Sequence, residues 1–279
     1  MSEEVTRQRL TGADDPRDRE IERLRATLAS ERLRSERDLA FARRIQLNLM
    51  PADAPAPEGW EIAFAYRAAR MVGGDFYDVY DLPAAGHRLG LVVADVTGKG
   101  LPAALMMAFS RAVLRAAAYN GSGPSDALRR TNRVLVRDAR TGLFLTALIA
   151  VLDPADGRLR YASAGHEFPL IRRHGSRRVR ELPSQGAMLG LLEHLAVRDR
   201  TVALQPGDLF VAYTDGVTDA AAPDGSRFGL QRLIELVREA SEATAGEVVA
   251  AVMAALEQFA GDADPADDIT VLAIRRSPA

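Results

Sequence analysis

Aspartate recurs at four places in this chain where a short apolar segment begins or ends. Each place couples an Asp to a predicted β-strand, and glycine at the first three permits close approach of the backbone. Carboxylates held close together repel one another unless a cation lies between them. The four segments are Gly73-Gly74-Asp75-Phe76-Tyr77-Asp78, Asp95-Val96-Thr97-Gly98-Lys99-Gly100, Tyr213-Thr214-Asp215-Gly216-Val217 and Asp267-Asp268-Ile269-Thr270.

The chemistry of these side chains indicates a metal centre. Any one segment alone would be an ordinary turn, so the prediction depends on their joint occurrence. Oxygen ligands in a chain with no cysteine and four histidines favour Mg²⁺ or Mn²⁺. We therefore expect a carboxylate-bound centre with two ions. The lack of cysteine also excludes disulfides, thiolate zinc sites and cysteine-nucleophile enzymes.

Composition narrows the possible partners. The 279 residues carry a net charge of −2, which provides no global basic field for nucleic acid or for an anionic membrane surface. No apolar run reaches the roughly 18 residues that a membrane span needs. The first thirty residues are charged and lack the apolar core of a signal peptide. We expect a cytoplasmic protein that binds neither nucleic acid nor membrane.

The N-terminal part has a different pattern from the rest of the chain. Residues 1–16 are polar and are expected to be flexible, whereas 17–50 lack Gly and Pro and space their apolar residues as in an amphipathic helix. This helical linker is predicted to form a coiled-coil dimer, or alternatively to pack on its own domain. The Pro-rich segment 51–59 ends the helix, and 60–276 are expected to form one domain.

The pattern after residue 59 predicts an α+β fold, because strands come in runs and helices in pairs. Turns such as Asp156-Gly157 and Pro206-Gly207 favour antiparallel strands. Strands are predicted at 60–67, 76–82, 88–95, 144–152, 159–163, 168–172, 197–204, 209–214 and 269–274, and helices at 101–119, 125–137, 230–240 and 245–259.

Seven segments occur in the order found in one known family. The chain closely resembles the SpoIIE/RsbU-like branch of the metal-dependent (PPM-type) serine/threonine protein phosphatases from about residue 42 to residue 274. That resemblance implies a four-layer αββα sandwich of two antiparallel sheets flanked by helices, with an N-terminal helical, coiled-coil-like extension. The segments are GGDFYD, DVTGKGLPAALMM, LFLTALIAVLD, YASAGHEFPLI, MLGLL, LQPGDLFVAYTDGVTDA and DDITVL.

The resemblance also implies ligands for two Mn²⁺ or Mg²⁺ ions. It makes Asp75 a ligand of one metal and Asp95 a bridge between both, with the Val96 backbone carbonyl as a further ligand. Asp215 and Asp267 complete the other metal. The implied reaction is hydrolysis of phosphoserine or phosphothreonine by a hydroxide that bridges the metals and that Asp95 positions.

Five further residues are weaker candidates. By resemblance, Asp78 and Asp268 would support the ligands from outside the coordination sphere or bind an occasional third ion. His166 is a catalytic participant or a structural hydrogen-bonding residue. Lys99, the single lysine among 36 basic residues, contacts phosphate or the helix that follows it. Arg70, five residues before Asp75, is a candidate for binding the substrate phosphate.

The resemblance implies a phosphorylated STAS-type anti-sigma-factor antagonist as the substrate, in bacterial sigma-factor regulation. The pattern of residues 17–50 predicts a homodimer. Because only about 16 residues precede this helix, we expect its input to come from an activating partner or through the helix itself. The alternative function is a partner-gated or non-catalytic dimeric signalling scaffold.

Overall fold

The N-terminal helix crosses the boundary between two compact units of the chain. In this computed structural model the first unit is Met1–Arg44 and the second is Ile45–Ala279. Helix α1 (Pro16–Leu49) closely matches the helix predicted at 17–50. Its apolar residues Ile21, Leu24 and Leu28 are exposed at helical spacing. Coiled-coil pairing through them stays a prediction, as does flexibility of 1–16, nearly all of which lies outside the described residues. The described residues are 16–82, 86–119, 123–138, 142–261 and 263–278.

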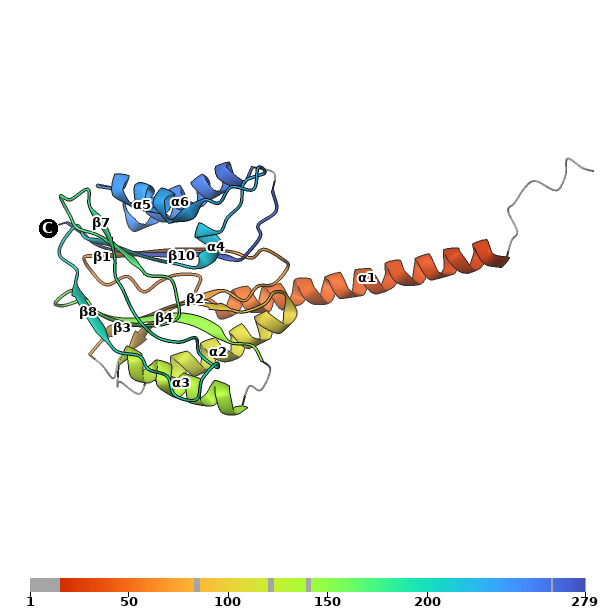
Figure 1. Cartoon of the computed structure of the whole chain (residues 1–279), viewed down its shortest axis with the longest axis horizontal. Coiled ribbons are helices and arrows are strands. Elements are labelled where there is room, and N and C mark those ends of the chain that lie inside the picture. Colours follow the sequence, from red (N-terminus) through yellow and green to blue (C-terminus); the bar gives the residue numbers. More distant parts are fainter. Residues whose placement is uncertain (1–15, 83–85, 120–122, 139–141, 262, 279) are drawn as a thin grey trace, which may run out of the picture. The chain divides into compact units, whose positions relative to one another are not determined.

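The second unit is built on two antiparallel sheets of five strands each. One sheet has the order β1-β10-β9-β6-β7 and the other β2-β3-β4-β5-β8. Helices α5 and α6 cover the first sheet and α2 and α3 cover the second, so four layers are stacked (Figure 1). The predicted α+β αββα sandwich is confirmed. The strands are β1 (Trp60–Arg67), β2 (Phe76–Leu82), β3 (Arg88–Val96), β4 (Leu145–Asp153), β5 (Arg158–Ala164), β6 (Leu170–Arg172), β7 (Val179–Glu181), β8 (Arg200–Ala203), β9 (Leu209–Tyr213) and β10 (Ile269–Arg276), and the helices are α2 (Leu101–Tyr119), α3 (Pro124–Asp138), α4 (Asp215–Thr218), α5 (Gly229–Glu239) and α6 (Ala245–Ala260).

The layers are held together by apolar side chains that face each other across them. Buried strand residues such as Val92 and Ile149 form the core between the second sheet and its neighbours. A second cluster, which includes Val211 and Val252, joins the first sheet to α5 and α6. Among the described helices, α2 alone is long and apolar enough to cross a membrane by length and composition, but part of its surface is buried in this core.

Several elements differ from the sequence prediction. Strand β6 is Leu170–Arg172 rather than 168–172, and β10 extends to Arg276 rather than ending at 274. Strand β8 is Arg200–Ala203 rather than 197–204; before it, the Val197 carbonyl accepts from Arg129 and not from a neighbouring strand. Strand β7 and the one-turn helix α4 were not predicted, since each is too short to show a hydrophobic period.

Candidate metal centre

The aspartates of the four sequence segments come together from both sheets. Asp75 immediately precedes β2, and Asp95 lies near the end of β3, which pairs with β2 in the second sheet. Asp215 begins α4 directly after β9, and Asp267 precedes β10 of the first sheet. Antiparallel order within each sheet brings the end of one strand beside the start of the next. The acids therefore meet where the two sheets face each other.

Asp75 is the best-enclosed of these carboxylates. Its Oδ2 accepts hydrogen bonds from Thr214 Oγ1 at 2.6 Å and from Thr270 Oγ1 at 2.8 Å. The two threonines also bond to each other's strand, because Thr270 N donates to Thr214 Oγ1 at 3.0 Å. These bonds join the start of β2 to the first sheet. Both donors are neutral, so they orient the Asp75 carboxylate without neutralising it.

Mutual repulsion and burial raise the pKa values of three of the acids. Burial raises the pKa of Asp75 well above its ordinary range, and the nearby Asp95 adds to this effect. Burial and the charge of Asp215 raise the pKa of Asp95 to about 6. The pKa of Asp215 rises through burial and then through Asp267. This cluster therefore favours any cation that enters it.

Two glycines permit the close backbone contacts of this centre. A Cβ on Gly74 would lie 2.6 Å from the Val96 carbonyl oxygen, so that carbonyl lies directly against the Asp75 loop. A Cβ on Gly216 would lie 1.8 Å from the Asp268 carbonyl oxygen. Neither position has room for a side chain. The glycines noted in the sequence thus bring Val96 and Asp215 close to the other candidate ligands.

Asp268 holds the loop that carries Asp75. Its Oδ1 accepts from the backbone N–H of Ala69 at 2.7 Å, and its Oδ2 accepts from the N–H of Gly74 at 2.6 Å. A third N–H, that of Asp75, lies 3.4 Å from Oδ2. Both carboxylate oxygens of Asp268 therefore accept hydrogen bonds from the loop backbone. The side chain of the neighbouring Asp267 is more exposed to solvent.

Gln46 holds the same loop from the other side, and the sequence reasoning missed it. Gln46 Nε2 donates to the Gly73 carbonyl at 2.6 Å, and the Gly73 N–H donates to Gln46 Oε1 at 3.1 Å. The side chain is buried in the last turns of α1. An amide side chain satisfies a backbone donor and acceptor at once. The only sequence signal was a glutamine among apolar residues just before Pro51.

Lys99 and Arg70 lie beside the carboxylates. Lys99 Nζ forms an ion pair with Asp267 Oδ2 at 2.9 Å and also donates to the Ala266 carbonyl. Arg70 is exposed, and its Nη1 would lie 4.0 Å from a Cβ on Gly100. Both cations therefore border the turn that follows β3. Neither position tests the predicted contact with phosphate.

Asp78 and His166 contact other side chains than the candidate metal ligands do. The buried Asp78 carboxylate pairs with Arg111 at 2.9 Å and with Arg115 at 3.6 Å, both on α2. His166 is buried with its Nδ1 2.8 Å from Thr146 Oγ1. Burial lowers the pKa of His166 to about 4, so the imidazole is neutral at neutral pH. A neutral imidazole with one nitrogen bonded to a hydroxyl fits a structural hydrogen-bonding residue.

The donor atoms fit hard divalent cations, although in this structure they contact polar groups of the chain itself. Across the described ranges, no group of three or more His, Asp or Glu side chains is placed to hold an ion as it stands. In this structure Asp75 accepts from two hydroxyls, Asp268 accepts from backbone N–H groups and Asp267 pairs with an ammonium. Carboxylate and carbonyl oxygens remain the ligands that Mg²⁺ and Mn²⁺ prefer.

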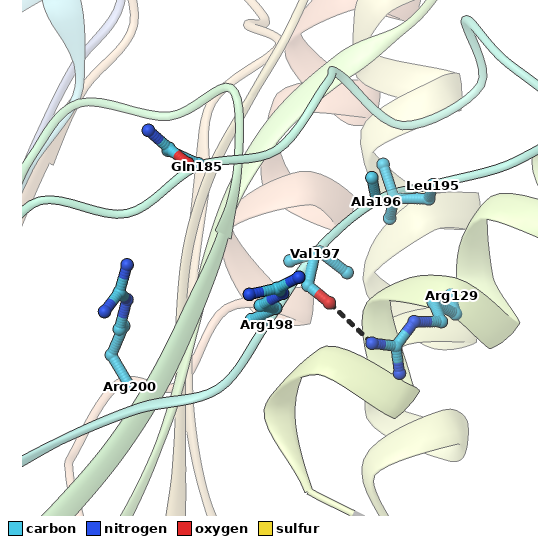
Figure 2. A pocket seen from close by; sticks show the side chains of 7 residues that line it. All are labelled: Arg129, Gln185, Leu195, Ala196, Val197, Arg198 and Arg200. Carbon is cyan, nitrogen blue, oxygen red and sulfur yellow. Dashed lines mark hydrogen bonds between the residues drawn. The ribbon is translucent and has the colours of Figure 1, made fainter.

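Three arginines are among the seven residues that line a separate hollow of about 500 Å³. Figure 2 shows Arg129 bonded to the Val197 carbonyl, with Arg198 and Arg200 on the adjoining segment. None of the candidate metal ligands lines this hollow. The carboxylate cluster and the arginine-lined hollow are therefore distinct features of the domain.

Comparisons with known proteins agree with this geometry. The family model for stage II sporulation protein E (SpoIIE) matches residues 85–277. Protein IcfG of Synechocystis sp. is 30% identical over 267 residues, which cover 86% of this chain and 42% of IcfG. Phosphoserine phosphatase RsbU of Bacillus subtilis is 29% identical over 242 residues, which cover 86% of this chain and 70% of RsbU. The chain thus spans less than half of IcfG and about two thirds of RsbU.

A solved structure supports the same assignment. The SiaA-PP2C domain of Pseudomonas aeruginosa superposes with a TM-score of 0.76 at 26% identity, covering 88% of this chain and 99% of that domain. The resemblance identified in the sequence is confirmed, and with it the expectation of an enzyme class, serine phosphatases of the PP2C type. This chain belongs to the SpoIIE family of PP2C-type phosphatases.

Proposed function

We propose that this chain is a divalent-metal-dependent phosphatase that removes phosphate from serine or threonine of a protein. The observation that carries the proposal is the convergence of Asp75, Asp95, Asp215 and Asp267 from both sheets, three of them with raised pKa values. A buried excess of negative charge is costly unless a cation compensates it. Membership of the SpoIIE family supports the same reading.

Each residue at the centre has a proposed role. Asp75, Asp95 and the Val96 carbonyl would hold one Mg²⁺ or Mn²⁺ ion, and Asp95, Asp215 and Asp267 would hold a second. Bound ions of this kind supply a hydroxide near neutral pH and stabilise charge on phosphoryl oxygens.

The surrounding residues keep the ligands in place. Thr214 and Thr270 hold the Asp75 carboxylate from the opposite sheet. Asp268 fixes the preceding backbone through its N–H bonds. Arg70, exposed beside Gly100, would bind the substrate phosphate through its guanidinium. Asp78 and His166 contribute to packing through Arg111 and Thr146 rather than to the chemistry.

We extend the proposal to partners and organisation. The substrate is a phosphorylated STAS-type anti-sigma-factor antagonist, in keeping with the name and similarity of the phosphoserine phosphatase RsbU. Residues 60–276 form the phosphatase domain, 51–59 a linker and 17–50 a helix that dimerises and receives an activating partner. The exposed apolar residues of α1 support pairing. The proposed location is the cytoplasm.

The test measures phosphate release from p-nitrophenyl phosphate and from a phosphoserine peptide in Mn²⁺, Mg²⁺ or EDTA. We expect metal-dependent turnover that Asp95→Asn and Asp267→Asn abolish. The matched control is Asp53→Asn, at an exposed aspartate outside the cluster, which should keep the wild-type rate.

Other outcomes separate the alternatives. Metal binding by calorimetry without turnover would favour the partner-gated form, and turnover should then return when an activating partner is added. If the wild type shows no turnover and binds no metal, the enzyme proposal is overturned and the non-catalytic scaffold remains.

A further inference from the structure

Lys99 occupies an unusual position in the chain and in the fold. It is the single lysine among 36 basic residues. It lies in the turn that follows β3, between Gly98 (φ +91°) and Gly100 (φ +78°). Both glycines have backbone angles that other residues rarely adopt. The turn therefore presents one lysine side chain directly beside the end of the strand that carries Asp95.

The ammonium of Lys99 lies against Asp267, a proposed ligand of the second metal ion. It pairs with Asp267 Oδ2 at 2.9 Å, and its charge lowers the pKa of Asp215 against the effects of burial and of Asp267. Within the described part of the chain, Lys99 is the only cation that forms an ion pair with Asp75, Asp95, Asp215 or Asp267. Its donation to the Ala266 carbonyl fixes it at this edge.

We propose that Lys99 is a built-in cation that competes with the second metal ion for Asp267. This inference rests on the proposed function. In the metal-free protein, the ammonium neutralises part of the carboxylate cluster. Binding of a divalent ion at Asp215 and Asp267 would displace it, because two cations at one carboxylate repel each other and compete for its lone pairs. Lys99 thus lowers the affinity for the second ion.

The chemistry of lysine suits this role better than that of arginine. Its ammonium is a compact, strongly hydrated charge on a flexible stem, and it leaves a carboxylate readily. A guanidinium would hold the carboxylate through two parallel N–H bonds. Lys99 and Asp267 are both more than a third exposed, so water can take over their contacts when they part.

Calorimetric Mn²⁺ titration of the whole chain measures the competition. Lys99→Met keeps an apolar stem and removes the charge. We expect the affinity of the weaker metal site for Mn²⁺ to rise about fivefold, because a partly exposed ion pair contributes up to about 1 kcal/mol. Lys99→Arg should lower that affinity. The matched control is Arg227→Met, which removes a positive charge from the exposed pair with Asp219 and should change the affinity by less than about twofold.

A second readout follows Lys99 itself. Protein labelled with lysine that carries ¹³C at Cε gives a single ε-methylene signal in NMR spectra, since Lys99 is the only lysine. Addition of Mg²⁺ should move that signal towards the position of a free, solvated lysine, with the midpoint of the weaker metal site. A lysine that only braces the turn would keep its signal unchanged while Mg²⁺ binds.

The outcomes distinguish this inference from the proposed function. Equal or weaker Mn²⁺ affinity in Lys99→Met, with wild-type metal binding and turnover intact, would overturn the competition and leave the phosphatase proposal standing. A lysine signal that does not respond to bound Mg²⁺ would do the same. Absence of both metal binding and turnover in the wild type would overturn both.

Discussion

Two buried aspartates of one six-residue segment have opposite surroundings. Asp75 contacts two neutral hydroxyls, and its charged neighbours Asp95 and Asp268 are acids that raise its pKa further. Burial raises the pKa of Asp78 as well, but the charges of Arg111 and Arg115 oppose that rise. The first carboxylate lacks a cation and the second has two. The uncompensated charge of Asp75 therefore indicates a cation-binding site, whereas the ion pairs of Asp78 with two arginines join β2 to α2.

The largest expected effect is the loss of phosphatase activity when Asp75, but not Asp78, loses its charge. Asp75→Asn should reduce metal-dependent phosphate release by more than about 100-fold, because it replaces a ligand carboxylate with a neutral amide. The metal-free variant should remain folded and be at least as stable as the wild type, since a buried charge is removed. Turnover assays and thermal unfolding in EDTA measure both. Near-normal turnover would remove Asp75 from the metal centre.

The reverse result is expected at Asp78. Asp78→Asn leaves the buried side of Arg111 without its carboxylate, and loss of one partner of a buried pair costs about 3–5 kcal/mol. Metal affinity per folded molecule should be almost unchanged. Urea unfolding and Mn²⁺ calorimetry test the two parts. A strong loss of metal affinity with unchanged stability would place Asp78 in the centre rather than in the packing of α2.

Gln46 offers a smaller, more local perturbation. Gln46→Leu keeps the side-chain size but leaves the buried N–H and C=O of Gly73 without partners, which should cost about 1–3 kcal/mol. Because Gly73 lies two residues before Asp75, metal affinity should fall as well. Asn48→Leu, at an exposed position two residues further along α1, is the control. Equal effects of both substitutions would show that only the helix, and not the loop contact, matters.

The last expected effect is a pH dependence of the metal-free protein. The pKa of Asp95 is raised from 3.8 to about 6 in the folded state, so the folded protein holds this proton more tightly than the unfolded chain. Asp95 therefore destabilises the fold progressively as the pH rises from about 4 to 6, and by a constant amount above that. The melting temperature of Asp95→Asn relative to wild type should rise over the same interval in EDTA. Saturating Mg²⁺ should make the wild type melt at the higher temperature at pH 7. A melting-temperature difference in EDTA that does not depend on pH would contradict the raised pKa of Asp95.

Much of the fold could be predicted because it depends on local patterns. The apolar runs before Asp95 and Asp215, and the glycine-containing turns between strands, predicted the order of strands and helices that the structure has. The paired runs of strands and helices also indicated layers. Short elements escaped prediction, because β7 and α4 have only three and four residues.

The sequence by itself determined which residue types were available for a metal centre: acids at strand ends, glycines beside them and no thiolate. The tertiary structure alone decided their partners. It brought Thr214 to Asp75 across 139 residues, turned Asp78 towards α2, set Gln46 under Gly73 and placed Lys99 against Asp267. A strand exposes alternate residues on opposite faces, but nothing local says which face meets a helix or the other sheet. Those contacts depend on how the layers pack, and they decide which carboxylates lack a cation.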